Sequence, residues 1–112
     1  MAKYLILYNS TAPASEVMAQ ATPEQMKASM EAWIAWKDEA VKVISFDFGM
    51  PLEAVTRITS DGVTDSDSHV SGYSIMEGDS KDTIIDLLKT HPLLQRPGST
   101  IDVLEMLAMP GM

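Results

Sequence analysis

Side chains whose ordinary pKa lies near neutral are few in this chain, and they lie far apart in the sequence. There are two histidines, His69 and His91, and no cysteine, which excludes thiolate nucleophiles and zinc sites built on sulfur. Proton transfer would therefore rest on His69, His91, Asp47 or Tyr73. No two of these residues stand at the spacing of a recognisable catalytic pair. His91 is expected to be solvated at a helix end, where the helix dipole favours the protonated form.

A second polar group, Asp61, Asp65, Asp67 and His69, lies in the segment "SDGVTDSDSH". In an extended segment alternate residues point the same way, so the last three could share a face and hold a metal ion. Aspartate and serine are also ordinary turn residues, and the spacing of a calcium-binding loop is absent. The turn interpretation is favoured, so no metal site is predicted. Without a glycine-rich phosphate loop, no cofactor is predicted either.

Aromatic side chains indicate a different kind of site. Trp33 and Trp36 are three residues apart, so they lie on adjacent parts of one helix face and could form an aromatic wall, although core or dimer packing is the favoured reading. The nine methionines suit an adaptable apolar surface, and they serve equally as core filler. The residues expected to line an apolar ligand pocket are Tyr8, Trp33, Phe48 and Tyr73.

Composition limits the partners of the chain. Its 112 residues, 46% of them hydrophobic, suit one domain over residues 1–112. The formal net charge of -8 would repel a phosphate backbone, so nucleic acid is not an expected partner. The apolar run that ends at Tyr8 is too short for a membrane span or a signal-peptide core. We therefore expect a soluble cytoplasmic protein with no membrane partner.

The elements that must position these residues begin with a strand over residues 3–8 and a loop over 9–21. The loop contains Pro13 and could be a flap over the end of the strand, or a plain connector with a helical turn near residues 16–20. A helix is predicted from Pro23 to near Ile44, because Thr22 can cap it, Pro23 suits its first position and Gln25 completes a capping box. Its expected buried stripe is formed by Met26, Met30, Trp33, Ala40, Val41 and Ile44.

The second half of the chain repeats this pattern. A second strand is expected over residues 46–59, either interrupted at "GMP" or split into two short segments, and residues 60–69 read as a turn region centred on Asp61-Gly62. A third strand over 70–77 would place Tyr73 toward the pocket. A helix capped by Asp79 or Ser80 then runs to Pro92, a loop follows, and residues 100–107 form the last strand before the tail 109–112.

This order, β-α-β-β-α-β, predicts an α+β fold of the ferredoxin-like type, a four-stranded antiparallel sheet with two helices on one face. The first and last strands carry apolar residues in both registers, so both faces of the sheet should be buried. A second copy of the chain would cover the face that the helices leave open. We therefore predict a homodimer whose sheets pack face to face.

The residues also resemble a known family. In order and spacing, the segments "KYLILY", "MEAWIAWKDE", "SDGV", "GYSIMEGDSKDTIIDLLKTHP" and "IDVLEM" resemble the YCII-related, or DGPF-domain, proteins over nearly the whole chain. The resemblance implies a dimeric α+β barrel. Some members resemble enzymes that use a histidine on the first helix, but the first helix here has none, and "TDSDSHV" replaces the segment that names the DGPF group. No catalytic role is therefore carried over to His69 or His91.

Two functions remain open at this point. The first is a homodimeric module that binds a small, largely apolar molecule between sheet and helix. The second is a cofactor-independent enzyme of small-molecule metabolism that uses His, Asp or Tyr for proton transfer. A histidine within hydrogen-bond reach of a carboxylate in a pocket would favour the enzyme. A pocket lined by Trp, Met, Phe and Tyr would favour binding.

Overall fold

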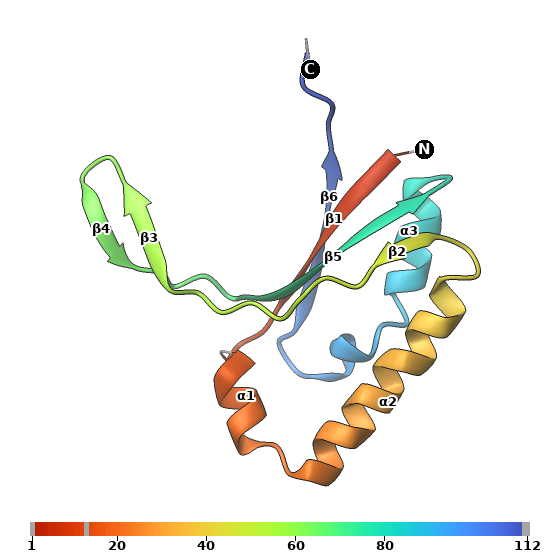
Figure 1. The fold of residues 1–112 in the computed structure, drawn as a ribbon, viewed down its shortest axis with the longest axis horizontal. Helices are drawn as coiled ribbons and strands as arrows, with labels where there is room; N and C mark the ends of the chain where they lie inside the picture. Colours follow the sequence, from red (N-terminus) through yellow and green to blue (C-terminus); the bar gives the residue numbers. More distant parts are fainter. Residues whose placement is uncertain (1, 13, 111–112) are drawn as a thin grey trace.

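The computed structural model describes residues 2–12 and 14–110 and shows an α+β fold (Figure 1). Four strands form the main sheet, two more form a separate hairpin, and three α-helices and one 3-10 helix complete the described chain. The elements in chain order are β1 (Ala2–Asn9), α1 (Ala14–Gln20), α2 (Pro23–Ala40), β2 (Ser45–Asp47), β3 (Thr56–Thr59), β4 (Gly62–Asp65), β5 (Val70–Gly78), α3 (Lys81–Leu88), η1 (Pro92–Gln95) and β6 (Thr100–Met106).

The main sheet has the strand order β2-β5-β1-β6, and every neighbouring pair is antiparallel. Its register places Leu5 of β1 opposite Ile75 of β5 on one side and Leu104 of β6 on the other. The predicted four-stranded antiparallel sheet is therefore confirmed. Because both β1 and β2 run antiparallel to β5, they run in the same direction with β5 between them.

The core is built from one face of this sheet and from α2 and α3. Alternation along β1 buries every second side chain, as a strand with one covered face requires. Met76 and Ser74 of β5 lie on the same covered face. The buried apolar cluster comprises Tyr4, Ile6, Tyr8, Trp36, Ala40, Ile44, Met76, Ile84 and Leu88.

Helix α2 begins as predicted but presents a different face to the core. The Thr22 side chain accepts a hydrogen bond from the Gln25 N–H (3.1 Å), and the Gln25 side chain accepts one from the Thr22 N–H (2.9 Å), which forms a capping box. The helix ends at Ala40, four residues before the predicted Ile44. The predicted stripe was wrong in part, because Trp36 is buried while Met26 and Met30 are exposed.

The connection between β1 and α2 contains the short helix α1. Its span, Ala14–Gln20, includes the helical turn expected near residues 16–20, and Pro13 lies outside the described residues. The Ser15 N–H and hydroxyl both donate to the Glu53 carboxylate. These hydrogen bonds hold α1 beside the segment that leads into β3.

The predicted second strand is two separate segments, and only β2 joins the main sheet. The chain bends at Gly49, where φ is 71° and a Cβ atom would lie 1.9 Å from the Tyr73 carbonyl oxygen, so only glycine fits. Pro51 then makes a single bridge to Gly72. Strands β3 and β4 pair with each other around Ser60-Asp61 and project from the sheet (Figure 1), so part of the expected turn region is strand.

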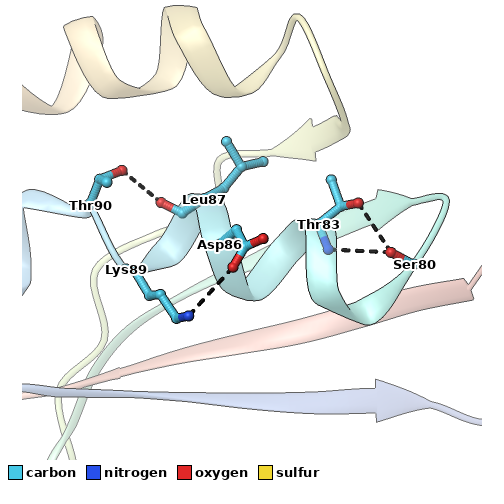
Figure 2. A network of polar contacts seen from close by, with 6 residues as sticks. All are labelled: Ser80, Thr83, Asp86, Leu87, Lys89 and Thr90. Atoms are coloured by element: carbon cyan, nitrogen blue, oxygen red, sulfur yellow. Dashed lines mark hydrogen bonds and ion pairs between the residues drawn. The ribbon is translucent and has the colours of Figure 1, made fainter.

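Helix α3 is fixed at both ends by local hydrogen bonds (Figure 2). The Ser80 hydroxyl caps the N-terminus by accepting from the Thr83 N–H (3.3 Å), and Lys89 pairs with Asp86 near the C-terminus (3.4 Å). The Thr90 hydroxyl donates to the Leu87 carbonyl (2.9 Å), to which the Trp36 indole also donates (3.1 Å). These bonds couple the end of α3 to α2.

The chain after α3 differs from the predicted loop. Helix α3 already ends at Leu88, before the predicted end at Pro92, and Pro92 instead starts η1, consistent with the fixed φ of proline at a first helical position. Strand β6 follows as predicted, and of the predicted tail 109–112 the last two residues lie outside the described part. Among the described helices, none has the length and apolar character that crossing a membrane requires.

Candidate functional site

A cavity of about 350 Å³ lies where the end of β1 meets α1, α2 and η1. Most of its wall is apolar, and its volume is within the range of small-molecule sites. The lining residues are Tyr8, Ser10, Val17, Met18, Met30, Trp33, Phe48, Gly49, Met50, Pro51, Ser71, Gly72, Tyr73, Leu93 and Arg96. We call this space the Trp33 pocket. The segment after β1 thus contributes Val17 and Met18 of α1 to a wall over the strand end.

Trp33 is the centre of the aromatic wall. Its ring lies 5.1 Å from Phe48 and 5.5 Å from Tyr8, measured between ring centroids. On another side it meets the His91 ring edge to face at 4.3 Å. Trp33 is half-buried, whereas Trp36 is buried and its indole N–H is already bonded to Leu87 and Thr90. Trp33 is therefore the tryptophan that can meet a ligand.

Tyr8 contributes its aromatic ring to this wall, and its hydroxyl does not serve as an acid there. Its hydroxyl donates to the Ser74 hydroxyl (2.9 Å), which in turn donates to the Phe48 carbonyl (2.9 Å). Burial raises the pKa of Tyr8 to about 12, outweighing the opposing effect of the Ser74 hydrogen bond. The phenol therefore stays neutral, and its proton is engaged in fixing the position of Phe48.

His91 lies behind Trp33, and the expectation that it is solvated was wrong. Its side chain is 1% exposed, stacks on Tyr8 at 5.0 Å and meets Trp36 at 4.6 Å. Its Nδ1 accepts the Leu93 N–H (3.0 Å), which places the proton of the neutral ring on Nε2. Burial lowers the pKa of His91 to about 4. The aromatic enclosure excludes the water that would stabilise the imidazolium, so the expected dipole effect is overridden.

The Nε2 atom of His91 has no hydrogen-bond partner among the described residues. The rings of Trp33 and Trp36 stand at 84° and 63° to the imidazole, so their π faces or edges surround it. An N–H···π contact can partly offset the missing partner. No Asp or Glu lies within hydrogen-bond reach of His91 in the described chain, so the second member of an acid–base pair is missing there.

The other predicted proton-transfer residues lie apart from His91. His69 is exposed, with its Nδ1 3.3 Å from the Ser10 carbonyl oxygen, and it lines a different cavity of about 360 Å³ together with Glu53 and Asp67. Asp47 is exposed and accepts the Gly49 N–H (3.1 Å), which stabilises the bend after β2. No hydrogen bond or ion pair joins these residues to one another within residues 2–12 and 14–110.

In the acidic segment that was considered as a metal site, Asp67 and Asp65 make other interactions. Asp67 pairs with Arg57, and the hydrogen bond from Arg57 lowers the pKa of Asp67 below its ordinary value. Asp65 lies in β4 opposite Thr56. Across the described part of the chain, no three His, Cys, Asp or Glu side chains are grouped so that they could hold a metal ion.

The structure brings three of the four predicted ligand-binding side chains, Tyr8, Trp33 and Phe48, into one wall. Tyr73 also borders the pocket. Its main-chain N–H donates to the carbonyl of Met50, another lining residue (3.3 Å). Strand alternation places its side chain on the opposite face from Ser74.

The main lining residue that the sequence did not indicate is Arg96. It stands in the loop after η1, where no periodic pattern marks its direction. Met30 could have been found from its position three residues before Trp33 on one helix. In comparisons with known proteins, no family model matches the chain and no curated protein sequence matches it.

Proposed function

We propose that this chain is a small-molecule binding module and that the Trp33 pocket is its binding site. The observation that carries the proposal is the wall formed by Trp33, Phe48 and Met30 around a cavity of about 350 Å³. Burying an apolar ligand against such a wall is favourable by about 25 cal/mol per Å² of apolar surface removed from water. Methionine side chains adapt to the shape of what they contact, which suits recognition of an apolar body.

The proposed assembly is a homodimer of ferredoxin-like, YCII-related chains whose open sheet faces pack together. The support is the strand order β2-β5-β1-β6, together with the apolar residues opposite the core face. Leu5 and Leu7 of β1 lie there between β5 and β6, and Leu5 has Ile75 and Leu104 as its direct neighbours. Leu104 is 44% exposed in the single chain, so this face gains from a covering partner. Such a protein would act in the cytoplasm.

One observation favours the enzyme alternative: a buried histidine whose Nε2 has no partner among the described residues lies next to the pocket wall. Trp33 and Tyr8 line the pocket and His91 does not, so a ligand in the pocket would contact these rings and not the imidazole. A proton-transfer residue needs hydrogen-bond reach to its substrate. Binding therefore explains this arrangement without requiring a proton-transfer residue within hydrogen-bond distance of the ligand.

A fluorescence titration tests the binding site. N-Phenyl-1-naphthylamine is neutral and becomes fluorescent in apolar sites, and we expect the chain to bind it saturably. Met30→Ala should weaken binding by about tenfold, because the lost thioether contact is of the order of 1 to 2 kcal/mol. Met26→Ala is the matched control, since Met26 is an exposed methionine one turn earlier on α2 and does not line the pocket. Equal affinities for both variants would place the probe elsewhere and contradict the proposal.

A further inference from the structure

Among the described residues that line the Trp33 pocket, Arg96 is the one that is charged. The chain has 16 acidic residues and a net charge of -8, yet no Asp or Glu is found in the described part of this wall. The neighbouring cavity near His69 is different, because Glu53 and Asp67 line it. The Trp33 pocket thus combines an apolar interior with a single cation, in a molecule whose overall charge is strongly negative.

The backbone of Arg96 is held in place at the pocket. Its N–H donates to the Leu93 carbonyl (3.1 Å), and its carbonyl accepts the Ser99 N–H (3.2 Å). Gly98 follows with φ of 78°, and a Cβ atom there would lie 2.7 Å from the Thr11 methyl group, so the loop packs closely on the chain after β1. These contacts fix the backbone of Arg96, an exposed residue that lines the pocket.

The guanidinium has no carboxylate partner in the described chain. The three ion pairs there use Lys42, Arg57 and Lys89 as the cations. A second cation, Lys37, lies with its Nζ 5.4 Å from the centroid of the Phe48 ring, which is part of the same wall. Lys37 does not line the pocket itself, so Arg96 is the cation available to an anion that enters it.

We infer that the Trp33 pocket takes a small apolar monocarboxylic acid, an inference that rests on the binding function proposed above. The apolar or aromatic body would lie against Trp33 and Phe48, where no charge has to be buried. The carboxylate would meet Arg96, whose planar fork of N–H donors matches two carboxylate oxygens. Because the rest of the molecule repels anions, the local cation is what makes an acid acceptable here.

The test compares 2-naphthoate with its neutral counterpart 2-naphthamide as competitors of bound N-phenyl-1-naphthylamine, using the full chain. We expect naphthoate to compete about tenfold more strongly, and Arg96→Gln to remove this preference while leaving naphthamide unchanged. Arg57→Gln is the matched control, because Arg57 is the chain's other arginine and lies in β3, outside the pocket. The Arg57→Gln protein should prefer naphthoate over naphthamide as strongly as the wild type does.

The outcomes separate the two proposals. Equal competition by naphthoate and naphthamide, with the probe still bound, would overturn the acid preference and leave apolar binding intact. A preference for naphthoate that persists in Arg96→Gln would overturn the role of Arg96. Failure of the chain to bind the probe or either compound would overturn the binding function and the acid preference together.

Discussion

His91 and His69 are the two histidines of the chain, and their surroundings differ completely. His69 is exposed beside a loop, whereas His91 is enclosed by Tyr8, Trp33 and Trp36. Burial lowers the pKa of His91 to about 4, below the value of about 6.5 expected in the unfolded chain. The unfolded state therefore binds more protons than the folded state between these two values.

This difference predicts a pH-dependent loss of stability. As pH falls from about 6.5 to about 4, protonation of His91 in the unfolded chain should lower the free energy of unfolding by up to about 3 kcal/mol. His91→Asn keeps an acceptor near the position of Nδ1 and removes the titrating group, so its stability should fall less steeply over this range. Urea denaturation at pH 7 and pH 4.5 measures the slope.

His69→Asn is the matched control for this measurement. Because His69 is exposed, its replacement should leave the wild-type dependence of stability on pH nearly unchanged. Carboxylates titrate in the same range in all three proteins, so only the difference between the variants reports on His91. A His91→Asn protein that loses stability as steeply as the wild type would show that His91 is protonated in the folded chain.

At the scale of elements, the sequence predicted structure well where the stabilising interactions join residues that are close together in the chain. The Thr22 capping box, the Ser80 cap and the alternation along β1 and β5 depend on neighbouring residues alone, and each is present. The separate hairpin was missed because Gly49 and Pro51 show only that the strand is interrupted. Whether the chain rejoins the sheet depends on distant partners.

The face that α2 presents to the core could not be predicted from periodicity. Apolar residues surround this helix, so Met26, Met30, Ile34 and Trp36 support more than one buried stripe. Packing against α3 decides the outcome, because the Trp36 indole bonds to the Leu87 carbonyl and Thr90. Trp33 is then rotated toward the pocket, where its contact with Phe48 forms the wall.

The candidate site was predictable only in its aromatic part. Tyr8, Trp33 and Phe48 are large apolar side chains near predicted element ends, where pockets tend to form. The burial of His91 depends on the turn of η1, and the position of Arg96 in the pocket wall depends on the close packing of Gly98 against Thr11. The packing of Gly98 on Thr11 and the enclosure of His91 by Tyr8, Trp33 and Trp36 join segments that are far apart in the chain, so neither has a signature in the sequence.

At the scale of the whole molecule, the open face of the main sheet determines the expected assembly. Leu5 lies in the middle of this face, opposite Ile75 and Leu104. We expect light scattering at micromolar concentration to give twice the mass of one chain. Leu5→Asp should shift the protein to single chains, because an unpaired carboxylate at the centre of a dry interface is strongly unfavourable.

The control for assembly is Met26→Asp, which places the same charge on an exposed part of α2. This variant should keep the mass of the wild type. Circular dichroism of both variants at pH 7 shows whether the fold is retained, so that unfolding is not mistaken for dissociation. A wild-type protein with the mass of one chain at these concentrations would contradict the proposed dimer.

The central claim is that a small apolar ligand binds against Trp33, and the two indole N–H signals in a 1H–15N NMR spectrum test it most directly. The chain has two tryptophans, and the Trp36 indole is held by Leu87 and Thr90 while Trp33 borders the pocket. A Trp33→Phe variant assigns the signals. Titration with 2-naphthamide should move the Trp33 signal saturably and the Trp36 signal much less. A Trp33 signal that stays in place at saturating naphthamide would contradict the account.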